Sequence, residues 1–301
     1  MTAPYHPRIT QWRDEKVIWI DSSNLDASLM SFKAGDASFV GISPYNGFKG
    51  TDISFLKSIP DLTGLVMPYP EGFSLDPVCG LSKLRLLVLG KERSAFDFST
   101  FADLTELSTD WKSSDVLPDS HSGLQRLSLW GFNSKSRDLR GLPAYRHLFS
   151  LKLVQGSLET LDDIEKYQSL REAEFAYLRR LKMVRAIGTC GVETLEFDSC
   201  RNIEDFALLA KCERLKLLRY SHCGSLQSLS PLKNFKALEN FRFVDTNILD
   251  GDLSPLLRLK STGFMMKRHY SHTPKQVAIA IGDASYFEIE EARKNRVVII
   301  S

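Results

Sequence analysis

The segments VETLEFDSC (residues 192–200) and LKLLRYSHC (residues 215–223) share one arrangement of side chains. In both, apolar residues occupy the first, fourth and sixth positions, and a cysteine occupies the ninth. Alternate side chains of a β-strand point to opposite faces, so the fourth and sixth positions of each segment share one face. The pattern therefore predicts short strands with one buried face, and its recurrence indicates an internal repeat.

The same apolar frame recurs along most of the 301-residue chain. Successive copies start about 22 residues apart, a period typical of solenoids built from stacked coils. A weaker copy, ASFVGI, starts at Ala37, so the chain has ten or eleven repeats. The ten clear copies start at Leu62, Leu84, Leu104, Leu124, Leu148, Leu170, Val192, Leu215, Leu238 and Leu259.

A second apolar set follows each frame at a fixed distance. After the frame at Val192, for example, Ile203, Phe206 and Leu209 recur at every third residue. This spacing suits a 3₁₀ turn or a short helix with one buried face. Each repeat is therefore predicted to form a strand, a turn and a return segment, which together close one coil.

Residues 37–266, which carry these frames, resemble the leucine-rich repeat family in its short form of about 22 residues per repeat. The resemblance implies an α/β solenoid, or horseshoe, with a concave parallel β-sheet and with short helices or 3₁₀ turns on the convex side. Residues 1–36 and 267–301 are then predicted to be the N-terminal and C-terminal caps. In the caps we predict a strand at VIWI (17–20), and strands that pair with the last coil at QVAIAI (276–281) and RVVII (296–300).

The ninth position of the frame usually holds Asn or Cys in this family, where the side chain satisfies backbone groups of the turn. Cys200 and Cys223 match that position. We interpret both as buried turn thiols, with a disulfide or a metal pair as the alternative. The ninth-position side chains of successive repeats would form a polar ladder. In other repeats this position holds Gly156, Leu178, Thr246 and Lys267, so the sequence predicts that the ladder is broken there.

The composition argues against several classes of protein. A net charge of +2 is no basic excess, which disfavours a nucleic acid as the partner. No apolar run approaches the roughly 18 residues of a membrane span. The N-terminal residues form no apolar signal segment, and five cysteines in such a chain indicate reduced thiols and a cytoplasmic location.

No signature of catalysis or of cofactor binding is found in the sequence. It lacks G-x-x-x-x-G-K-[ST], G-x-G-x-x-G, H-E-x-x-H and G-x-S-x-G. His269 and His272 have the spacing of two metal ligands, but no carboxylate or cysteine partner is identifiable, so we favour exposed cap imidazoles. We expect a non-enzymatic protein without cofactor or metal; an active site improvised on the concave face is the alternative.

The fifth position of each frame faces outward on the concave side. Down the repeats it is first apolar, then acidic and finally basic. Adjacent strands lie about 4.8 Å apart, so opposite charges in this row could form surface ion pairs. Like charges also become neighbours, which is destabilising and favours a docking strip over a purely stabilising ladder. The row comprises Val66, Val88, Ser108, Ser128, Lys152, Glu174, Glu196, Arg219, Arg242 and Gly263.

Two tryptophans are the other candidate feature. Trp111 and Trp130 hold the eighth and seventh positions of neighbouring repeats, which predicts two indoles at one rim of the sheet, as an interface anchor or as loop filling. The candidate partner-binding residues combine this pair with the charged part of the row and with outward side chains at other frame positions. They are Trp111, Trp130, Lys152, Glu172, Glu174, Tyr177, Glu196, Asp198, Arg219, His222 and Arg242.

The sequence thus predicts non-enzymatic recognition of a protein or peptide on the concave face. In this hypothesis the acidic residues meet a basic patch of the partner, the arginines meet an acidic patch, and the tryptophans bind an apolar anchor. The alternative is an inhibitor or immunity-type protein that binds and blocks one enzyme or toxin.

Overall fold

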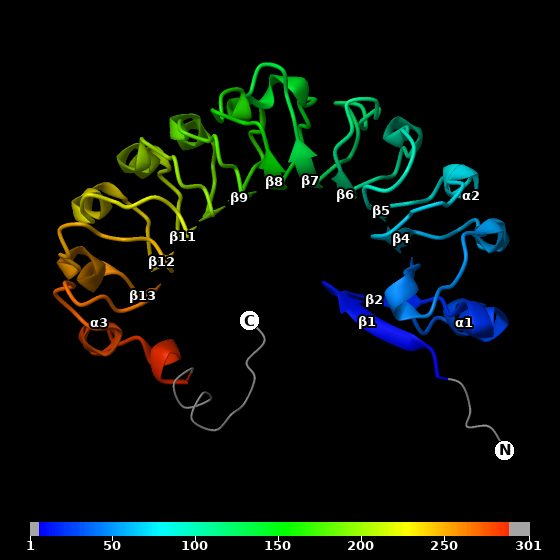
Figure 1. Cartoon of the computed structure of the whole chain (residues 1–301), viewed down its shortest axis with the longest axis horizontal. Coiled ribbons are helices and arrows are strands. Elements are labelled where there is room, and N and C mark those ends of the chain that lie inside the picture. Colours follow the sequence, from blue (N-terminus) through cyan, green and yellow to red (C-terminus); the bar gives the residue numbers. More distant parts are fainter. Residues whose placement is uncertain (1–5, 289–301) are drawn as a thin grey trace. The chain divides into compact units, whose positions relative to one another are not determined.

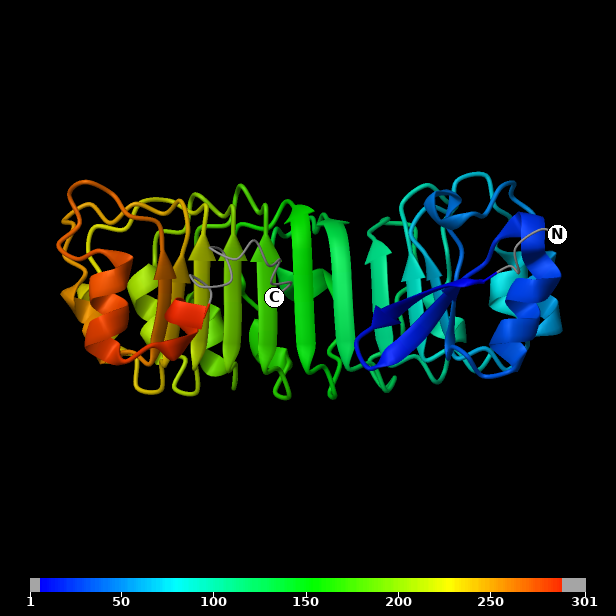
Figure 2. The same cartoon turned by 90° about the horizontal axis from the view of Figure 1, so that it is seen from below.

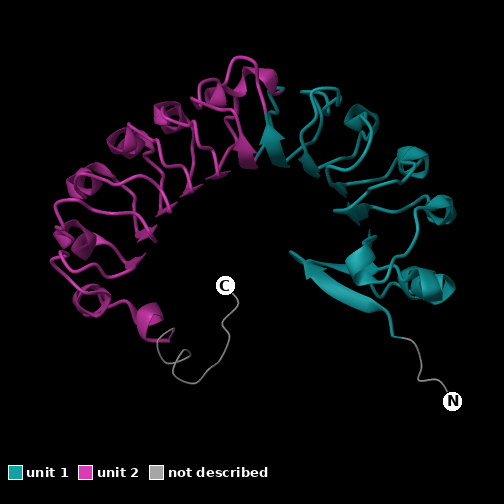
Figure 3. Ribbon diagram, in the orientation of Figure 1, with its two compact units in different colours: residues 1–132, 143–148 teal, residues 133–142, 149–301 magenta. Residues whose placement is uncertain are grey.

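The computed structural model describes residues 6–288. The chain divides into two compact units, which are coloured separately in Figure 3. Unit 1 consists of Met1–Phe132 and Pro143–Leu148, and unit 2 consists of Asn133–Leu142 and Phe149–Ser301. Each unit contains its own run of coils.

The strands of each unit pair in chain order. In unit 1 the pairing is parallel except in the β1–β2 hairpin, which is antiparallel. Its strands are β1 (Arg8–Trp12), β2 (Glu15–Trp19), β3 (Phe39–Gly41), β4 (Gly64–Met67), β5 (Leu86–Leu89), β6 (Glu106–Asp110) and β7 (Arg126–Phe132). In unit 2 all pairs are parallel. Its strands are β8 (Ser150–Gly156), β9 (Glu172–Ala176), β10 (Thr194–Asp198), β11 (Leu217–Ser221), β12 (Asn240–Phe243) and β13 (Ser261–Phe264).

Parallel neighbours require a crossover, and here most return segments contain a short 3₁₀ turn or helix. In unit 1 these are η1 (Ser22–Asn24), α1 (Leu25–Lys33), η2 (Pro44–Asn46), η3 (Ser54–Ser58), α2 (Asp76–Cys79) and η4 (Phe98–Thr100). In unit 2 they are η5 (Leu139–Gly141), η6 (Ile164–Lys166), η7 (Arg185–Thr189), η8 (Phe206–Lys211), η9 (Ser230–Asn234), η10 (Ser254–Arg258) and α3 (Pro274–Ile281).

Within each unit the strands line the inner side of the coils and the 3₁₀ turns lie on the outer side (Figure 1). Figure 2 looks onto the strand-lined side, where the strands of each unit run side by side. The leucine-rich repeat solenoid predicted from the sequence is therefore the fold of this chain. Among the described residues the longest α-helix, α1, has nine residues, whereas a membrane span needs about 20.

The inward frame positions form the core of each unit. Val192, Leu195 and Phe197 are fully buried, and the matching residues of the frames from Leu62 to Leu238 are buried too. Phe197 also stacks on the aromatic ring of the preceding coil with centroids 5.5 Å apart. Burial of each such side chain contributes about 1.5–3 kcal/mol. Because these contacts are shared with the neighbouring coils, one coil alone has no core.

The strand register confirms the predicted order of the fifth-position side chains within each unit. In unit 1 the successive neighbours are Val66, Val88, Ser108 and Ser128. In unit 2 they are Lys152, Glu174, Glu196, Arg219, Arg242 and Gly263.

The ninth frame position satisfies backbone carbonyls of the preceding coil in unit 2. Cys200 Sγ donates to the carbonyl oxygen of Phe175 at 3.3 Å, and the thiol of Cys223 makes the equivalent contact at 3.5 Å. Both thiols are buried and free, as predicted, and burial raises the pKa of Cys200 to about 12, which keeps it a protonated donor.

Thr246 continues this ladder. Its hydroxyl donates to the carbonyl oxygen of Tyr220 at 2.9 Å and accepts from the N–H of Cys223 at 3.1 Å. The prediction that the ladder breaks at Thr246 is wrong, because a hydroxyl can donate and accept at once.

The eighth frame position turns the chain out of the strand through a left-handed backbone conformation. Tyr177, Ser199 and His222 have φ of 55°, 57° and 52°, and Gln155 and Asp245 have the same conformation. None of these residues is glycine, and the left-handed region costs a side-chain-bearing residue about 1–2 kcal/mol. The sequence frame does not reveal this strain, since no glycine marks the position.

The N-terminal strand prediction is confirmed, because VIWI (17–20) overlaps β2, which pairs with β3. The predicted strand at QVAIAI (276–281) is wrong, because these residues belong to helix α3. Thr273 and Gln276 form a capping box that starts the helix, and Gly282 ends it at φ 69°. The predicted strand at RVVII lies outside the described residues, and the limits of the two caps stay predictions.

Replacement of Thr246 by Val tests the turn ladder. The change keeps the shape of the side chain but leaves a buried carbonyl and a buried N–H without a partner, so the free energy of unfolding should fall by about 1–3 kcal/mol. Thr246→Ser, which keeps the hydroxyl, is the control and should lose clearly less. If urea denaturation gave the same decrease in the free energy of unfolding for both variants, the hydrogen bonds of Thr246 would not be what stabilises the turn.

Candidate functional site

Five charged side chains form a row on the strand-lined face of unit 2. Lys152 Nζ lies 2.6 Å from Glu174 Oε1, and Arg219 Nη1 lies 2.9 Å from Glu196 Oε2. These side chains are partly exposed, so each pair stabilises the fold by about 0–1 kcal/mol. We call Lys152, Glu174, Glu196, Arg219 and Arg242 the charged row. The two ion pairs expected from the sequence are present and neutralise all of its members except Arg242.

Arg242 is the uncompensated member of the charged row. It lies beside Arg219 in the register and beside Gly263 on its other side. Within residues 6–288 its guanidinium group forms no ion pair. Like charges on adjacent strands are destabilising. The row therefore ends in a positive charge that the described part of the fold does not use.

Several other predicted residues lie at the ends of the same strands. Asp198 accepts a hydrogen bond from Ser199 Oγ at 3.0 Å, and its Oδ1 lies 2.9 Å from His222 Nδ1. The other ring nitrogen of His222 lies 3.5 Å from Asp245 Oδ2. The structure thus brings Asp198 and His222 together in one carboxylate–imidazole–carboxylate cluster.

Glu172 and Tyr177 were also predicted as site residues. Glu172 is the register neighbour of Thr194 on β10, at the strand end opposite the turns. Tyr177 lies in the turn after β9 and is 48% exposed. The two residues therefore lie at opposite ends of β9.

Three arginines that the sequence frame did not select lie around Tyr177. Two hollows of about 440 and 310 Å³ share Tyr177 and Arg179; Arg201 lines the first and Arg180 lines the second. Among the described residues these three guanidinium groups form no ion pair. The sequence contains a pattern that could have selected two of them, because Arg179 and Arg201 both hold the tenth position of their frames.

In unit 1 the chain itself covers the apolar start of the fifth-position row. Trp12 and Trp19 of the β1–β2 hairpin pack against a buried cluster that includes Val66. Arg13, in the hairpin turn, places its Nε 3.2 Å from Glu106 Oε2 on β6. Part of the face expected to meet a partner is therefore occupied by the N-terminal hairpin.

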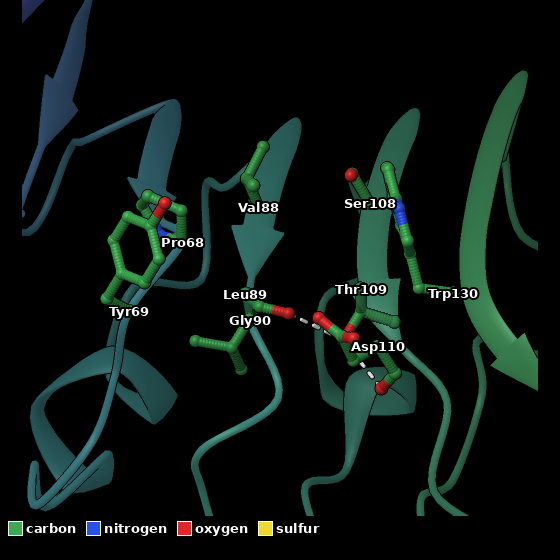
Figure 4. Close-up of a pocket in the computed structure, with 9 residues that line it drawn as sticks. All are labelled: Pro68, Tyr69, Val88, Leu89, Gly90, Ser108, Thr109, Asp110 and Trp130. Carbon is green, nitrogen blue, oxygen red and sulfur yellow. Dashed lines mark hydrogen bonds between the residues drawn. The ribbon is translucent and has the colours of Figure 1, made fainter. Parts of the chain in front are cut away.

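A hollow of about 300 Å³ lies at the carboxyl ends of the strands of unit 1 (Figure 4). Tyr69 stands on one side and Trp130 on the other, with Val88, Ser108 and Asp110 between them. We call this hollow the Asp110 pocket. Its other lining residues are Pro68, Leu89, Gly90 and Thr109.

Close packing shapes this pocket. A Cβ on Gly90 would lie 2.0 Å from the carbonyl oxygen of Pro68, so only glycine fits where the turn after β4 approaches β5. Thr109 Oγ1 donates to the carbonyl oxygen of Leu89 at 2.8 Å, which ties β6 to β5 (Figure 4).

Asp110 is half-buried in the pocket. Burial raises the pKa of its carboxyl above the ordinary value, and nearby Lys91 and Arg93 act in the opposite direction. In the part of the chain that the structure describes, no group donates a hydrogen bond to this carboxylate. Asp110 holds the seventh position of the frame that starts at Leu104, and the sequence frame gives no indication of the hollow around it.

The two predicted tryptophans have different surroundings. Trp130 lines the Asp110 pocket, whereas Trp111 packs edge-on against the buried ring of Phe132 with centroids 5.1 Å apart. Trp111 thus contacts the end of β7, and Trp130 is the one of the two that lines a hollow.

A buried ion pair holds the wall of the Asp110 pocket. Arg93 Nη1 and Nη2 each lie 2.7 Å from a carboxylate oxygen of Asp115, and both side chains are fully buried. Arg93 Nη2 also donates to Thr109 Oγ1 at 3.0 Å and to the carbonyl oxygen of Asp110 at 3.1 Å. Sequence reasoning missed this pair because both residues lie in turns outside the repeated frame.

No group of three or more His, Cys, Asp or Glu residues able to hold a metal occurs within residues 6–288. His269 Nε2 lies 2.8 Å from the carbonyl oxygen of Ile248, and His272 Nδ1 lies 2.8 Å from Ser271 Oγ. The two imidazoles thus contact different parts of the chain.

No protein-family model and no curated protein matches this chain. Among solved structures, the chain is similar to an internalin, InlF, from Listeria monocytogenes strain 4b F2365, with 15% sequence identity and a TM-score of 0.48 over 81% of this chain and 76% of that one. It is also similar to the functional domain of InlJ from Listeria monocytogenes, with 12% identity and a TM-score of 0.44 over 77% of this chain and 54% of that one. The chain thus spans about half of the InlJ domain.

Loss of one partner of the buried ion pair tests its structural role. Arg93→Met leaves the Asp115 carboxylate buried and uncompensated, so we expect the free energy of unfolding to fall by about 3–5 kcal/mol in urea denaturation. Lys83→Met, which breaks the exposed Lys83–Asp61 pair, is the control and should have little effect. A small effect of Arg93→Met would contradict the role given to the pair.

Proposed function

We propose that this protein recognises a protein or peptide partner on the strand-lined face of its solenoid and catalyses no reaction. The charged row is the main support for the proposal. Repeating coils hold its five ionisable side chains in register on one partly exposed sheet face, where Arg242 has no opposite charge in the described chain. A sheet face that served stability alone would favour alternating charges.

The ion pairs of the charged row change what the face would offer to a partner. Glu196 and Arg219 already neutralise one another, so either residue alone would attract a charged group of the partner only weakly. Their fixed order along the sheet nevertheless gives the face a direction, negative before positive. A partner with the complementary order of charges would be oriented by this face, and such complementarity raises the association rate more than the affinity.

The proposed contact residues are those selected from the sequence except Trp111, with their roles adjusted to the geometry. Arg242 is the proposed contact for an acidic group of the partner. Asp198, which already contacts His222, contributes to the surface as part of that cluster rather than as a free carboxylate. Trp130 is the proposed aromatic contact in unit 1, without Trp111.

Two finer statements belong to the same proposal. The partner is a protein rather than a nucleic acid, since the net charge is only +2. We also propose a cytoplasmic location, which the four buried free thiols support. An inhibitor or immunity-type protein would use the same face, and it would abolish the activity of its partner enzyme or toxin.

Exchange of the two charges of one ion pair tests the proposal. The double variant Glu196→Arg with Arg219→Glu keeps an ion pair but changes the order of charges along the charged row, so that positive and negative side chains alternate. Association with the partner captured from native lysate should slow several-fold at low salt, and high salt should reduce the difference.

The matched control is the exchange Glu239→Lys with Lys260→Glu, which inverts an exposed pair at the second frame position. It should leave the association rate unchanged. Equal rates for the wild type and the Glu196–Arg219 exchange variant, measured by stopped-flow or surface plasmon resonance, would contradict recognition through this row.

A further inference from the structure

The Asp110 pocket combines three kinds of surface that one ligand group would satisfy together. Val88 supplies an apolar wall, Tyr69 and Trp130 supply aromatic rings, and Asp110 supplies a carboxylate (Figure 4). Ser108, two residues before Asp110 on β6, adds a hydroxyl. The hollow, of about 300 Å³, is large enough for a single long side chain.

The carboxylate is the decisive group in this pocket. The cations near Asp110 are Lys91, Arg93 and Lys112. Arg93 is bound to Asp115, and the ammonium group of Lys112 donates to the carbonyl oxygen of Arg93. The Asp110 carboxylate is also partly buried, and no group of the described chain donates a hydrogen bond that would replace the lost water.

The aromatic residues of the pocket, like the Asp110 carboxylate, favour a positively charged ligand. A cation is attracted to the face of an aromatic ring by the quadrupole of the ring, most strongly at tryptophan. Tyr69 is 50% exposed and meets Tyr45 edge-on at 4.9 Å, so its ring is held at the rim of the hollow. Trp130 stands on the opposite side.

We propose that the Asp110 pocket binds the basic side chain of a lysine or arginine of the protein partner. The ammonium or guanidinium group would pair with the Asp110 carboxylate, and the aliphatic stem would lie against Val88 between the two aromatic rings. An anionic group would be repelled by Asp110, and a purely apolar side chain would bury this carboxylate without a partner. The inference rests on the proposed function, to which it adds the chemistry of one partner residue.

The test uses N-acetyl-lysine N-methylamide as the probe, titrated into the full chain and followed by the NMR signal of the Trp130 indole N–H. N-acetyl-norleucine N-methylamide, which has a similar stem and no charge, is the matched probe. The lysine probe should bind at least about tenfold more tightly than the norleucine probe. Equal binding of the two probes, or no binding of the lysine probe, would overturn the proposal.

Two variants connect the effect to the carboxylate. Asp110→Asn should weaken binding of the lysine probe about tenfold and should not weaken binding of the norleucine probe. Asp103→Asn, at an exposed carboxylate of the same unit, should change neither. Unshifted indole signals of Trp12 and Trp19 would show that each variant is folded. Unchanged lysine binding by folded Asp110→Asn would contradict the proposal.

A second measurement needs no variant. The carboxyl ¹³C signal of Asp110 reports its pKa directly, and saturation with the lysine probe should lower that pKa, because a bound cation favours the ionised form. An unchanged pKa at saturation would place the cation elsewhere and overturn the assignment.

The failure of this inference can be distinguished from the failure of the proposed function, because the probe titration needs no partner. If the lysine probe binds as expected but Asp110→Asn leaves partner association unchanged, the partner does not use the pocket and the inference fails. The exchange at Glu196 and Arg219 would still test recognition through the charged row.

Discussion

Burial of inward side chains between consecutive coils is the constraint on which the rest of the structure depends. Phe197 contacts the aromatic rings of the coils before and after it, so its position is set by both neighbours. Parallel pairing of the strands then brings the fifth frame position of each coil beside that of the next. The same contacts that stabilise the core thus keep the outward side chains in rows. No outward side chain can shift along the sheet without breaking this packing.

The two units use this constraint differently. In unit 2 the outward row is charged and partly paired, and it ends at Arg242, which has no ion-pair partner in the described chain. In unit 1 the row begins with apolar residues that the β1–β2 hairpin covers through Trp12 and Trp19. Unit 1 also contains the Asp110 pocket, whose wall is held by a buried ion pair rather than by the repeated apolar contacts.

The sequence predicted those features that follow from periodicity. Apolar residues spaced by two and by about 22 residues correctly predicted the coil, the strand register and the neighbours of Glu196. The sequence did not predict contacts made by residues outside the repeated frame. Examples are the ion pair of Arg93 with Asp115 and the packing of the β1–β2 hairpin against the sheet. Helix α3 was missed because its apolar run resembles a strand, although Thr273 and Gln276 carry the capping signal. Thr246 was misjudged because family preference, rather than hydrogen-bonding capacity, was applied.

The central claim is that the partner docks on the strand-lined face rather than on the side of the 3₁₀ turns. Site-specific photo-crosslinking in native lysate tests it most directly, with the photoreactive residue either at Thr194 on β10 or at Ala207 in η8. Thr194 holds an outward frame position on the sheet, and Ala207 is exposed on the outer side of the same coil. The account predicts one specific crosslinked partner from position 194 and none from position 207. Crosslinks to that partner from position 207 alone, or equally from both positions, would contradict it.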